Sequence, residues 1–273
     1  KYTKYSVIII ILFSIIVLSL TSAYHVSGDG CWHMSVSRFI SEQKKIPLFE
    51  PLGRDEPFWS PPLYHFVAAL VYSIFSPFNH NAANFAIKFI SPIFGILSLM
   101  ISFLLIKKLY GSKIAFYSII FLAFVPIFID YSVLSYVESM LTFFVVLSIY
   151  FLIKGRVWLS GIAAGLASLA KYIGLFVLPV LFFILYKRHG IRKKLFSDSF
   201  FLAIPVLIIA GPWLARNWLM LGNPIWPFLN LLFNGYQTET YAGLTESIKI
   251  GNLFTSNALI FLYLGMFGVP DGN

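Results

Sequence analysis

The sequence carries very little charge for its length. Only 11% of its 273 residues are Asp, Glu, Lys or Arg, whereas 59% are hydrophobic. Soluble domains carry about 25% charged residues, so this composition excludes an ordinary soluble domain and indicates a polytopic membrane protein. The chain also has a single cysteine, Cys31, which excludes an intrachain disulfide.

Acidic residues are the scarcer charged class, with 11 of them against 20 basic residues. A net charge of +9 can indicate nucleic acid as a partner. Here the basic residues occur in short clusters between apolar runs, which is typical of residues that flank membrane spans. We therefore expect membrane lipids, and no nucleic acid, among the partners.

Seven apolar segments are candidates for crossing the membrane, because a helix of about 20 residues spans about 30 Å of hydrocarbon. One long run, 157–186, would place Lys171 near the bilayer centre at a cost of at least about 3 kcal/mol, so we expect two helices with a turn at Lys171. The segment 61–78 starts with two prolines and predicts a helix at the membrane interface. The expected spans are 5–24, 84–106, 112–129, 140–153, the two halves of 157–186, and 200–214.

The Lys and Arg positions predict the orientation. With a cytoplasmic N-terminus and seven crossings, 12 of the 20 basic residues and one acid, Asp198, fall inside, as the positive-inside rule requires. A single crossing over 157–186, or an extra one over 61–78, would place basic clusters outside.

The whole chain, 1–273, is expected to form one transmembrane module. Residues 25–83 would form a large first external loop, and 215–273 an external loop with a partial further helix at 257–267. The chain begins with Lys and has no clear stop after its last apolar run, so we expect it to be part of a longer protein.

Polar residues converge on the predicted outer side. A carboxylate can act as a general base on an acceptor hydroxyl or amide, and a second one can share a divalent cation such as Mg²⁺ or Mn²⁺ with it. A Lys and an Arg at the membrane surface suit a phosphate head group. This combination indicates transfer of a group from a lipid-phosphate carrier. The candidates are Asp29, His33, Asp55, Glu56, His65, Glu138, Lys171, Arg216 and Asn217.

Structural roles compete with these functional ones. Asp55 and Glu56 can simply pair with Arg54, Lys171 can snorkel to the interface, and an acid beside a span is usually a solvated loop residue. Glu138 is a stronger candidate because it leads directly into an apolar span, where acids are costly. The joint placement on one side favours a functional site.

Six short motifs follow one another in an order that resembles the GT-C superfamily of membrane glycosyltransferases. Within it, the chain is similar to the group of dolichyl-phosphate-mannose protein mannosyltransferases and aminoarabinose lipid A transferases. The motifs are D-G-x-x-H at 29–33, I-x-x-x-x-x-I-P at 40–47, P-P-L-Y-H at 61–65, Y-V-E-S-M at 136–140, G-L-A-S-L-A-K-Y at 165–172 and R-N-W-L-M-L-G-N-P at 216–224.

The resemblance implies an all-α, seven-span module whose first external loop carries membrane-surface helices. It implies a polyprenyl-phosphate sugar as donor, with a protein, lipid or glycan acceptor. Asp29 would be the catalytic acid and Glu138 the second acidic site. Many relatives carry an Asp-Glu pair in this loop, whereas Asp29 is followed by Gly30. We expect His33, His65, Asp55 and Glu56 to support the acceptor or a metal ion. If a metal ion binds, its expected ligands are Asp29, His33 and Glu138. The expected contacts to the lipid phosphate are Lys171, Tyr172, Arg216 and Asn217.

Two other functions stay open at this point. A transporter or flippase of lipid-linked saccharides would place charges along a path at mid-membrane, whereas here they cluster at one face. A structural subunit that shapes a partner enzyme would not need a first loop so rich in acids and histidines.

Overall fold

The described residues fold almost entirely into helices. The computed structural model describes residues 1–51 and 56–237, and in this part extended structure is limited to one antiparallel bridge, between Phe49 and Pro57. The all-α fold class is therefore confirmed, while the expected helix at 257–267 and Asp55 lie outside the described residues. The helices are α1 (Tyr2–Ala23), α2 (Asp29–Gln43), α3 (Leu63–Phe75), α4 (His80–Ile87), α5 (Ile90–Tyr110), α6 (Ser112–Ala123), α7 (Pro126–Val133), α8 (Glu138–Ile153), α9 (Val157–Ala170), the 3-10 helix η1 (Tyr172–Phe176), α10 (Val177–His189), α11 (Lys193–Leu221) and α12 (Asn230–Phe233).

The long helices make the chain a multi-pass membrane protein. Four segments of the described chain are long and apolar enough to cross a membrane, and α6 with α7 would make a fifth. With 16 and 14 residues, α8 and α9 are about 24 and 21 Å long, short of the hydrocarbon thickness of about 30 Å. All seven expected runs are helical, but the count of seven crossings stays a prediction. The four segments are Tyr2–Ala23, His80–Tyr110, Tyr172–His189 and Lys193–Leu221.

Two breaks interrupt the apolar runs. The expected turn at Lys171 is confirmed, because α9 ends at Ala170 and Lys171 is extended, with φ −157° and ψ 142°. The run 112–129 was expected to be one helix, but it is bent by 67° between α6 and α7. Pro126 begins α7, and proline disfavours a helical conformation at the residue before it.

Small residues allow α9 to approach its neighbours closely. A Cβ atom on Gly161 would lie 2.4 Å from the carbonyl oxygen of Leu202 in α11. A Cβ on Gly174 of η1 would lie 2.4 Å from the carbonyl oxygen of Ala167 in α9. Both positions need glycine because the facing atoms belong to the backbone. The close contact at Gly174 packs η1 against the end of α9, next to the break that carries Lys171.

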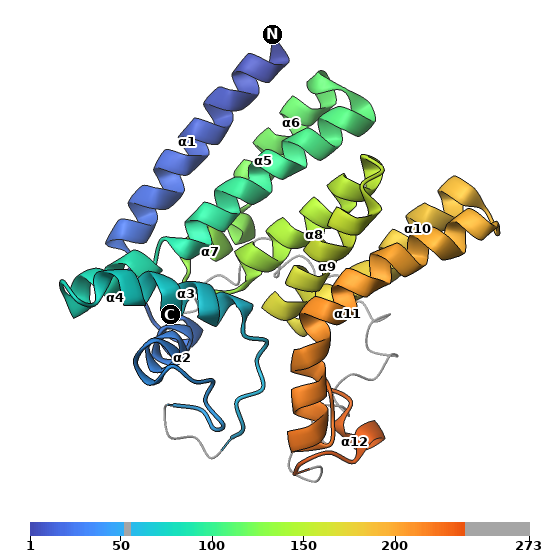
Figure 1. Ribbon diagram of the computed structural model, residues 1–273. Helices are drawn as coiled ribbons and strands as arrows, with labels where there is room; N and C mark the ends of the chain where they lie inside the picture. Colours follow the sequence, from blue (N-terminus) through green and yellow to red (C-terminus); the bar gives the residue numbers. More distant parts are fainter. Residues whose placement is uncertain (52–55, 238–273) are drawn as a thin grey trace, which may run out of the picture.

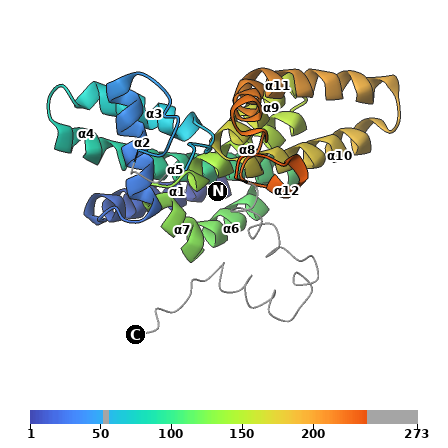
Figure 2. The same cartoon turned by 90° about the horizontal axis from the view of Figure 1, so that it is seen from below.

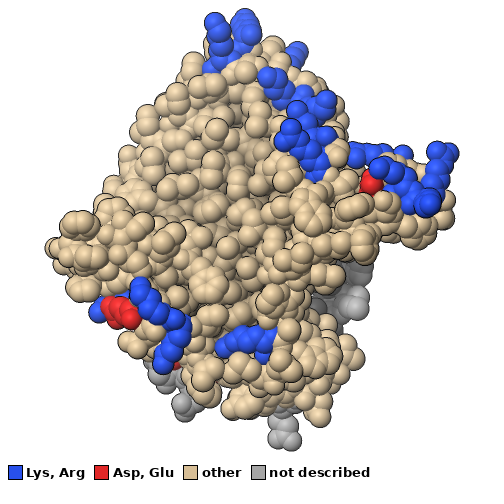
Figure 3. Space-filling view, viewed as in Figure 1, with Lys and Arg blue, Asp and Glu red and all other residues tan. Residues whose placement is uncertain are grey.

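The two ends of the bundle differ in charge and in structure. Helices α2 and α3 lie at one end of the long helices (Figure 1), on the opposite side from α10 and α11 when that end is viewed directly (Figure 2). Lys and Arg side chains gather over the other end (Figure 3), where the N-terminus and the connections α5–α6, α8–α9 and α10–α11 lie. The unequal distribution of basic residues expected from the sequence is thus present in the fold. The location of α3 at a membrane interface stays a prediction.

Candidate active site

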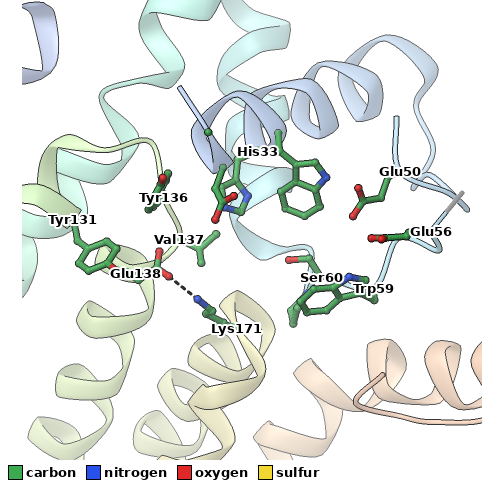
Figure 4. Close-up of a pocket in the computed structure, with 14 residues that line it drawn as sticks. His33, Glu50, Glu56, Trp59, Ser60, Tyr131, Tyr136, Val137, Glu138 and Lys171 are labelled. Atoms are coloured by element: carbon green, nitrogen blue, oxygen red, sulfur yellow. Dashed lines mark hydrogen bonds and ion pairs between the residues drawn. The ribbon is translucent and has the colours of Figure 1, made fainter. Parts of the chain in front are cut away.

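A cavity of about 590 Å³ opens at the end of the bundle that carries α2 and α3. Its walls come from the start of α2, the segment before α3, the α7–α8 connection and the α9–η1 break (Figure 4). Five of the residues singled out from the sequence line it, namely Asp29, His33, Glu56, Glu138 and Lys171. Segments more than 140 residues apart therefore meet at one cavity.

Asp29 is the first residue of α2, where the positive end of the helix dipole favours a carboxylate. The preceding Gly28 has φ +54°, a left-handed conformation that suits glycine, and it lets the chain turn into the helix. The hydroxyl of Tyr136 lies close to Gly28. Burial, and then the negative charge of Asp29, raise the pKa of Tyr136, with a smaller contribution from Glu138. Tyr136 and the two predicted acids line the same cavity.

Glu138 and Lys171 form an ion pair across the cavity wall. Glu138 is the first residue of α8, and its Oε1 atom lies 2.5 Å from Nζ of Lys171 at the end of α9 (Figure 4). Their side chains are 27% and 45% exposed, so both can still reach a ligand in the cavity. Lys171 is thus held at the site, rather than extended along the membrane surface.

His33 and His65 form a buried pair. His33 lies one helical turn after Asp29, and its Nδ1 atom is 2.9 Å from Nε2 of His65 on α3. Burial, followed by the neighbouring His65 and Lys171, lowers the pKa of His33 well below its usual value. Burial likewise lowers the pKa of His65 to about 3. Both rings are therefore neutral at neutral pH, and only His33 lines the cavity.

The segment between α2 and α3, here named the 44–62 loop, contributes an acidic and aromatic wall. The backbone N–H of Glu50 donates to the carbonyl of Glu56 at 2.9 Å, which brings these two residues together on the side away from Glu138 (Figure 4). Trp32 and Trp59 also line the cavity. The sequence reasoning missed Glu50, although Glu-Pro at 50–51 and again at 56–57, with a glycine between them in the sequence, is a hairpin-like signal.

Tyr136, Tyr131 and Ser60 were missed for a different reason. They line the cavity, but tyrosine is frequent near membrane interfaces, serine is common throughout the chain, and the motif Y-V-E-S-M at 136–140 was interpreted through Glu138 alone. Tyr136 stands two residues before Glu138, so the α7–α8 connection contributes both. A search for polar side chains beside each predicted acid would have included it.

Three residues predicted to bind phosphate lie behind the wall rather than in it. The Tyr172 hydroxyl donates to the carbonyl of Trp59 at 2.7 Å and accepts from Nδ2 of Asn217 at 2.5 Å. Arg216 donates from Nη1 to the carbonyl of Phe58 at 2.7 Å. Its Nη2 donates to the carbonyl of Pro47 at 3.3 Å. These side chains of η1 and α11 hold the backbone of the 44–62 loop, and we call them the loop clamp. Their role as phosphate ligands stays a prediction.

Replacing Arg216 with lysine is expected to loosen the 44–62 loop. Lysine keeps the charge but cannot reach two carbonyls as the forked guanidinium does, and hydrogen bonds to a charged group contribute about 1.5–3 kcal/mol each. Trypsin cleavage after Lys44 and Lys45 should become about ten to a hundred times faster, as measured by mass spectrometry of timed digests. The control is Arg38→Lys, because Arg38 is exposed on α2 and bonds only to the nearby Glu42 side chain. Equal cleavage of R216K and R38K would contradict the clamp.

The expected metal ligands do not converge. Within residues 1–51 and 56–237, no group of three His, Cys, Asp or Glu side chains lies close enough to hold a metal ion. Nδ1 of His33 is bonded to His65, and the Glu138 carboxylate is paired with Lys171. These residues therefore do not fit a three-ligand site as they stand. A divalent cation stays a prediction, and no step of the proposed reaction passes through one.

Comparison with known proteins gives a family match and a fold match. The family model described as dolichyl-phosphate-mannose-protein mannosyltransferase matches residues 59–215, more than half of the chain. That range includes Glu138, Lys171 and Tyr172 and ends one residue before Arg216. No curated protein sequence matches the chain.

Two solved structures share the fold. ArnT from Cupriavidus metallidurans bound to undecaprenyl phosphate is 18% identical with a TM-score of 0.60, over 82% of this chain and 43% of ArnT. The archaeal oligosaccharyltransferase AglB from Archaeoglobus fulgidus, in complex with an inhibitory peptide and a dolichol-phosphate, is 16% identical with a TM-score of 0.64, over 98% of this chain and 38% of AglB. At these identities the similarity shows the fold alone, and the chain spans about two-fifths of these proteins.

Proposed function

Since the chain belongs to the dolichyl-phosphate-mannose-protein mannosyltransferase family, we propose that it is a membrane glycosyltransferase with a polyprenyl-phosphate sugar as donor. The observation that carries the proposal is one cavity with a carboxylate, Asp29, and an ammonium group, Lys171, in its walls. The structures of ArnT and AglB with this fold contain undecaprenyl phosphate and dolichol-phosphate, which supports a lipid phosphate as the carrier.

The Asp29 carboxylate and the Lys171 ammonium group suit the two parts of the reaction, which are activation of the acceptor and departure of the phosphate. An oxygen or nitrogen of the acceptor forms a bond to the anomeric carbon while the bond from that carbon to the phosphate oxygen breaks. The Asp29 carboxylate takes the acceptor proton as general base. The polyprenyl phosphate leaves with the bonding electron pair, and the positive charge of Lys171 stabilises its added negative charge. Glu138 holds Lys171 in place through their ion pair.

The proposed reaction takes place on the external or lumenal face. The basic clusters at the end opposite the cavity favour a cytoplasmic location for that end. The N-terminus would then be cytoplasmic, and the first external loop would present the acceptor, which is a protein, lipid or glycan.

The test is consumption of a defined donor by the full-length protein. Purified protein in proteoliposomes would be given polyprenyl-phosphate [¹⁴C]mannose and a membrane extract as the source of acceptors. Thin-layer chromatography should show free polyprenyl phosphate and label in a new product. If labelled donor crosses the bilayer intact and no product forms, the protein is a transporter instead. If neither occurs with mannose, pentose or aminopentose donors, the proposal is wrong.

A further inference from the structure

A second pocket lies along the contact between α2 and α3. Its volume is about 340 Å³, near the lower end of the range of about 300–1,000 Å³ for ligand pockets. It shares no lining residue with the cavity of the candidate active site. We name it the α2–α3 pocket. Its walls include two serines, two lysines and two large apolar residues, namely Ser41, Ser73, Lys44, Lys45, Phe66 and Leu70.

The two serines join α2 to α3 and leave the lysines to meet a ligand. Oγ of Ser41 lies 2.7 Å from Oγ of Ser73, and Oγ of Ser73 donates to the carbonyl of Ala69 at 2.8 Å. A hydroxyl has one proton to donate, so Ser73 gives its proton to Ala69 and Ser41 donates to Ser73. Neither hydroxyl then has a proton for an anion. The side-chain donors of the pocket are therefore the ammonium groups of Lys44 and Lys45.

Lys44 and Lys45 place two adjacent positive charges at the end of α2. Both side chains are exposed, and the salt bridges found in residues 1–51 and 56–237 involve neither of them. The nearby Glu42 is paired with Arg38 instead. Lys44 has φ +54°, a left-handed conformation in which glycine is usual at a helix end. Because lysine is less favourable than glycine there, its presence points to a use for the side chain.

Large apolar side chains extend from the pocket along α3. Phe66, Leu70 and Ile74 are 40%, 64% and 55% exposed, and their spacing of four residues places them in one stripe on the helix. An exposed apolar stripe is unfavourable in water but matches the acyl chains of a membrane. Phe66 and Leu70 line the same pocket as the two lysines. The surface therefore suits a molecule with an anionic head and a hydrocarbon tail.

We propose that the α2–α3 pocket binds an anionic phospholipid, with its phosphate head group at Lys44 and Lys45 and an acyl chain along the stripe on α3. A free phosphate would leave the stripe without an occupant. The carrier of the proposed reaction would be too far from the cavity, because Asp29 and Lys44 are separated by the length of α2, about 22 Å. The lipid site goes beyond the proposed function and uses none of its catalytic residues.

A photoreactive lipid would test the site locally. Full-length protein in phosphatidylcholine nanodiscs would be given phosphatidylglycerol or phosphatidylcholine with a diazirine in one acyl chain, and labelled peptides would be mapped by mass spectrometry. We expect α3 to be labelled about ten times more by the phosphatidylglycerol probe. Equal labelling by the two probes would mean that the stripe contacts lipid without selecting a head group, and the inference would be wrong.

Variants at the two lysines separate recognition of the head group from folding. Lys44→Gly combined with Lys45→Gln removes both charges, and glycine eases the left-handed backbone at position 44. Labelling of α3 by phosphatidylglycerol should fall about tenfold to thirtyfold. Lys44→Arg combined with Lys45→Arg should retain it. The control, Lys107→Gln with Lys108→Gln, removes equal charge from the last turn of α5, at the opposite end of the bundle. Undiminished labelling of K44G/K45Q would overturn the inference.

Competition distinguishes the phospholipid from other sources of phosphate. Excess unlabelled phosphatidylglycerol should displace the probe, whereas excess inorganic phosphate should not. Displacement by inorganic phosphate would assign the pocket to a free anion and reject the lipid. If polyprenyl phosphate displaces the probe more strongly than phosphatidylglycerol does, the pocket belongs to the carrier, which also rejects the proposal. None of these measurements uses sugar transfer, so failure of the glycosyltransferase assay leaves them unaffected.

Discussion

Asp29→Asn is expected to lower the rate of sugar transfer by about 10² to 10⁴, the usual contribution of a general base. Asparagine has nearly the same shape but cannot take a proton from the acceptor. Binding of the donor should change little, because Asp29 lies at the start of α2 and forms no ion pair with Lys171, whose partner is Glu138. Single-turnover transfer from polyprenyl-phosphate [¹⁴C]mannose would separate the chemical step from donor binding.

The matched control for D29N is Glu42→Gln. Glu42 lies on the same helix, but it is paired with Arg38 and does not line the cavity. E42Q should therefore transfer sugar at close to the wild-type rate. Transfer by D29N at the E42Q rate would remove Asp29 from the role of base. Loss of donor binding in D29N alone would instead assign it to the binding of the sugar.

Lys171→Met is expected to weaken binding of the polyprenyl-phosphate donor by about tenfold to a hundredfold. The variant removes the positive charge proposed to face the phosphate and leaves the Glu138 carboxylate without its partner, so both effects oppose an anionic ligand. Equilibrium binding of labelled donor to the purified protein would measure the change. Lys113→Met is the control of equal charge, because Lys113 is in the first turn of α6, at the opposite end of the bundle.

The double variant distinguishes a structural from a ligand-binding role for this pair. If Lys171 only neutralises Glu138, then K171M combined with Glu138→Gln should bind the donor nearly as well as wild type. If Lys171 contacts the phosphate, the double variant should stay weak, and E138Q alone should have the smaller effect. A double-mutant cycle on the donor dissociation constant gives the coupling between the two residues. Recovery of binding in the double variant would reject the phosphate contact.

Much of the fold follows from local features of the sequence. Apolar runs give helices because a membrane core leaves backbone groups no other hydrogen-bond partners. The break at Lys171 follows from the cost of a charge at mid-membrane. The spacing of Asp29 and His33 follows from the helical repeat. Each of these rests on residues within one or two helical turns of one another.

Other features depend on contacts between distant segments and escaped the sequence reasoning. Arg216 looks like a phosphate ligand in sequence, yet two of its nitrogens donate to carbonyls 158 and 169 residues earlier. Glu50 joins the cavity only because its backbone pairs with that of Glu56, which brings both residues into the same wall. The bend at Pro126 was a local signal, but hydropathy alone placed it inside one continuous run.

The loop clamp also has a consequence for the order of events during synthesis. Pro47 and Phe58 leave the ribosome long before Arg216, and at about 5–20 residues per second the delay is on the order of ten seconds. During this interval the bridge between Phe49 and Pro57 can form, but the carbonyls that Arg216 will bind must remain hydrated. The loop clamp is therefore completed late in biosynthesis, after the chain through Arg216 of α11 has been translated. A nascent chain stalled before Arg216 should insert its first helices and still lack the finished loop clamp.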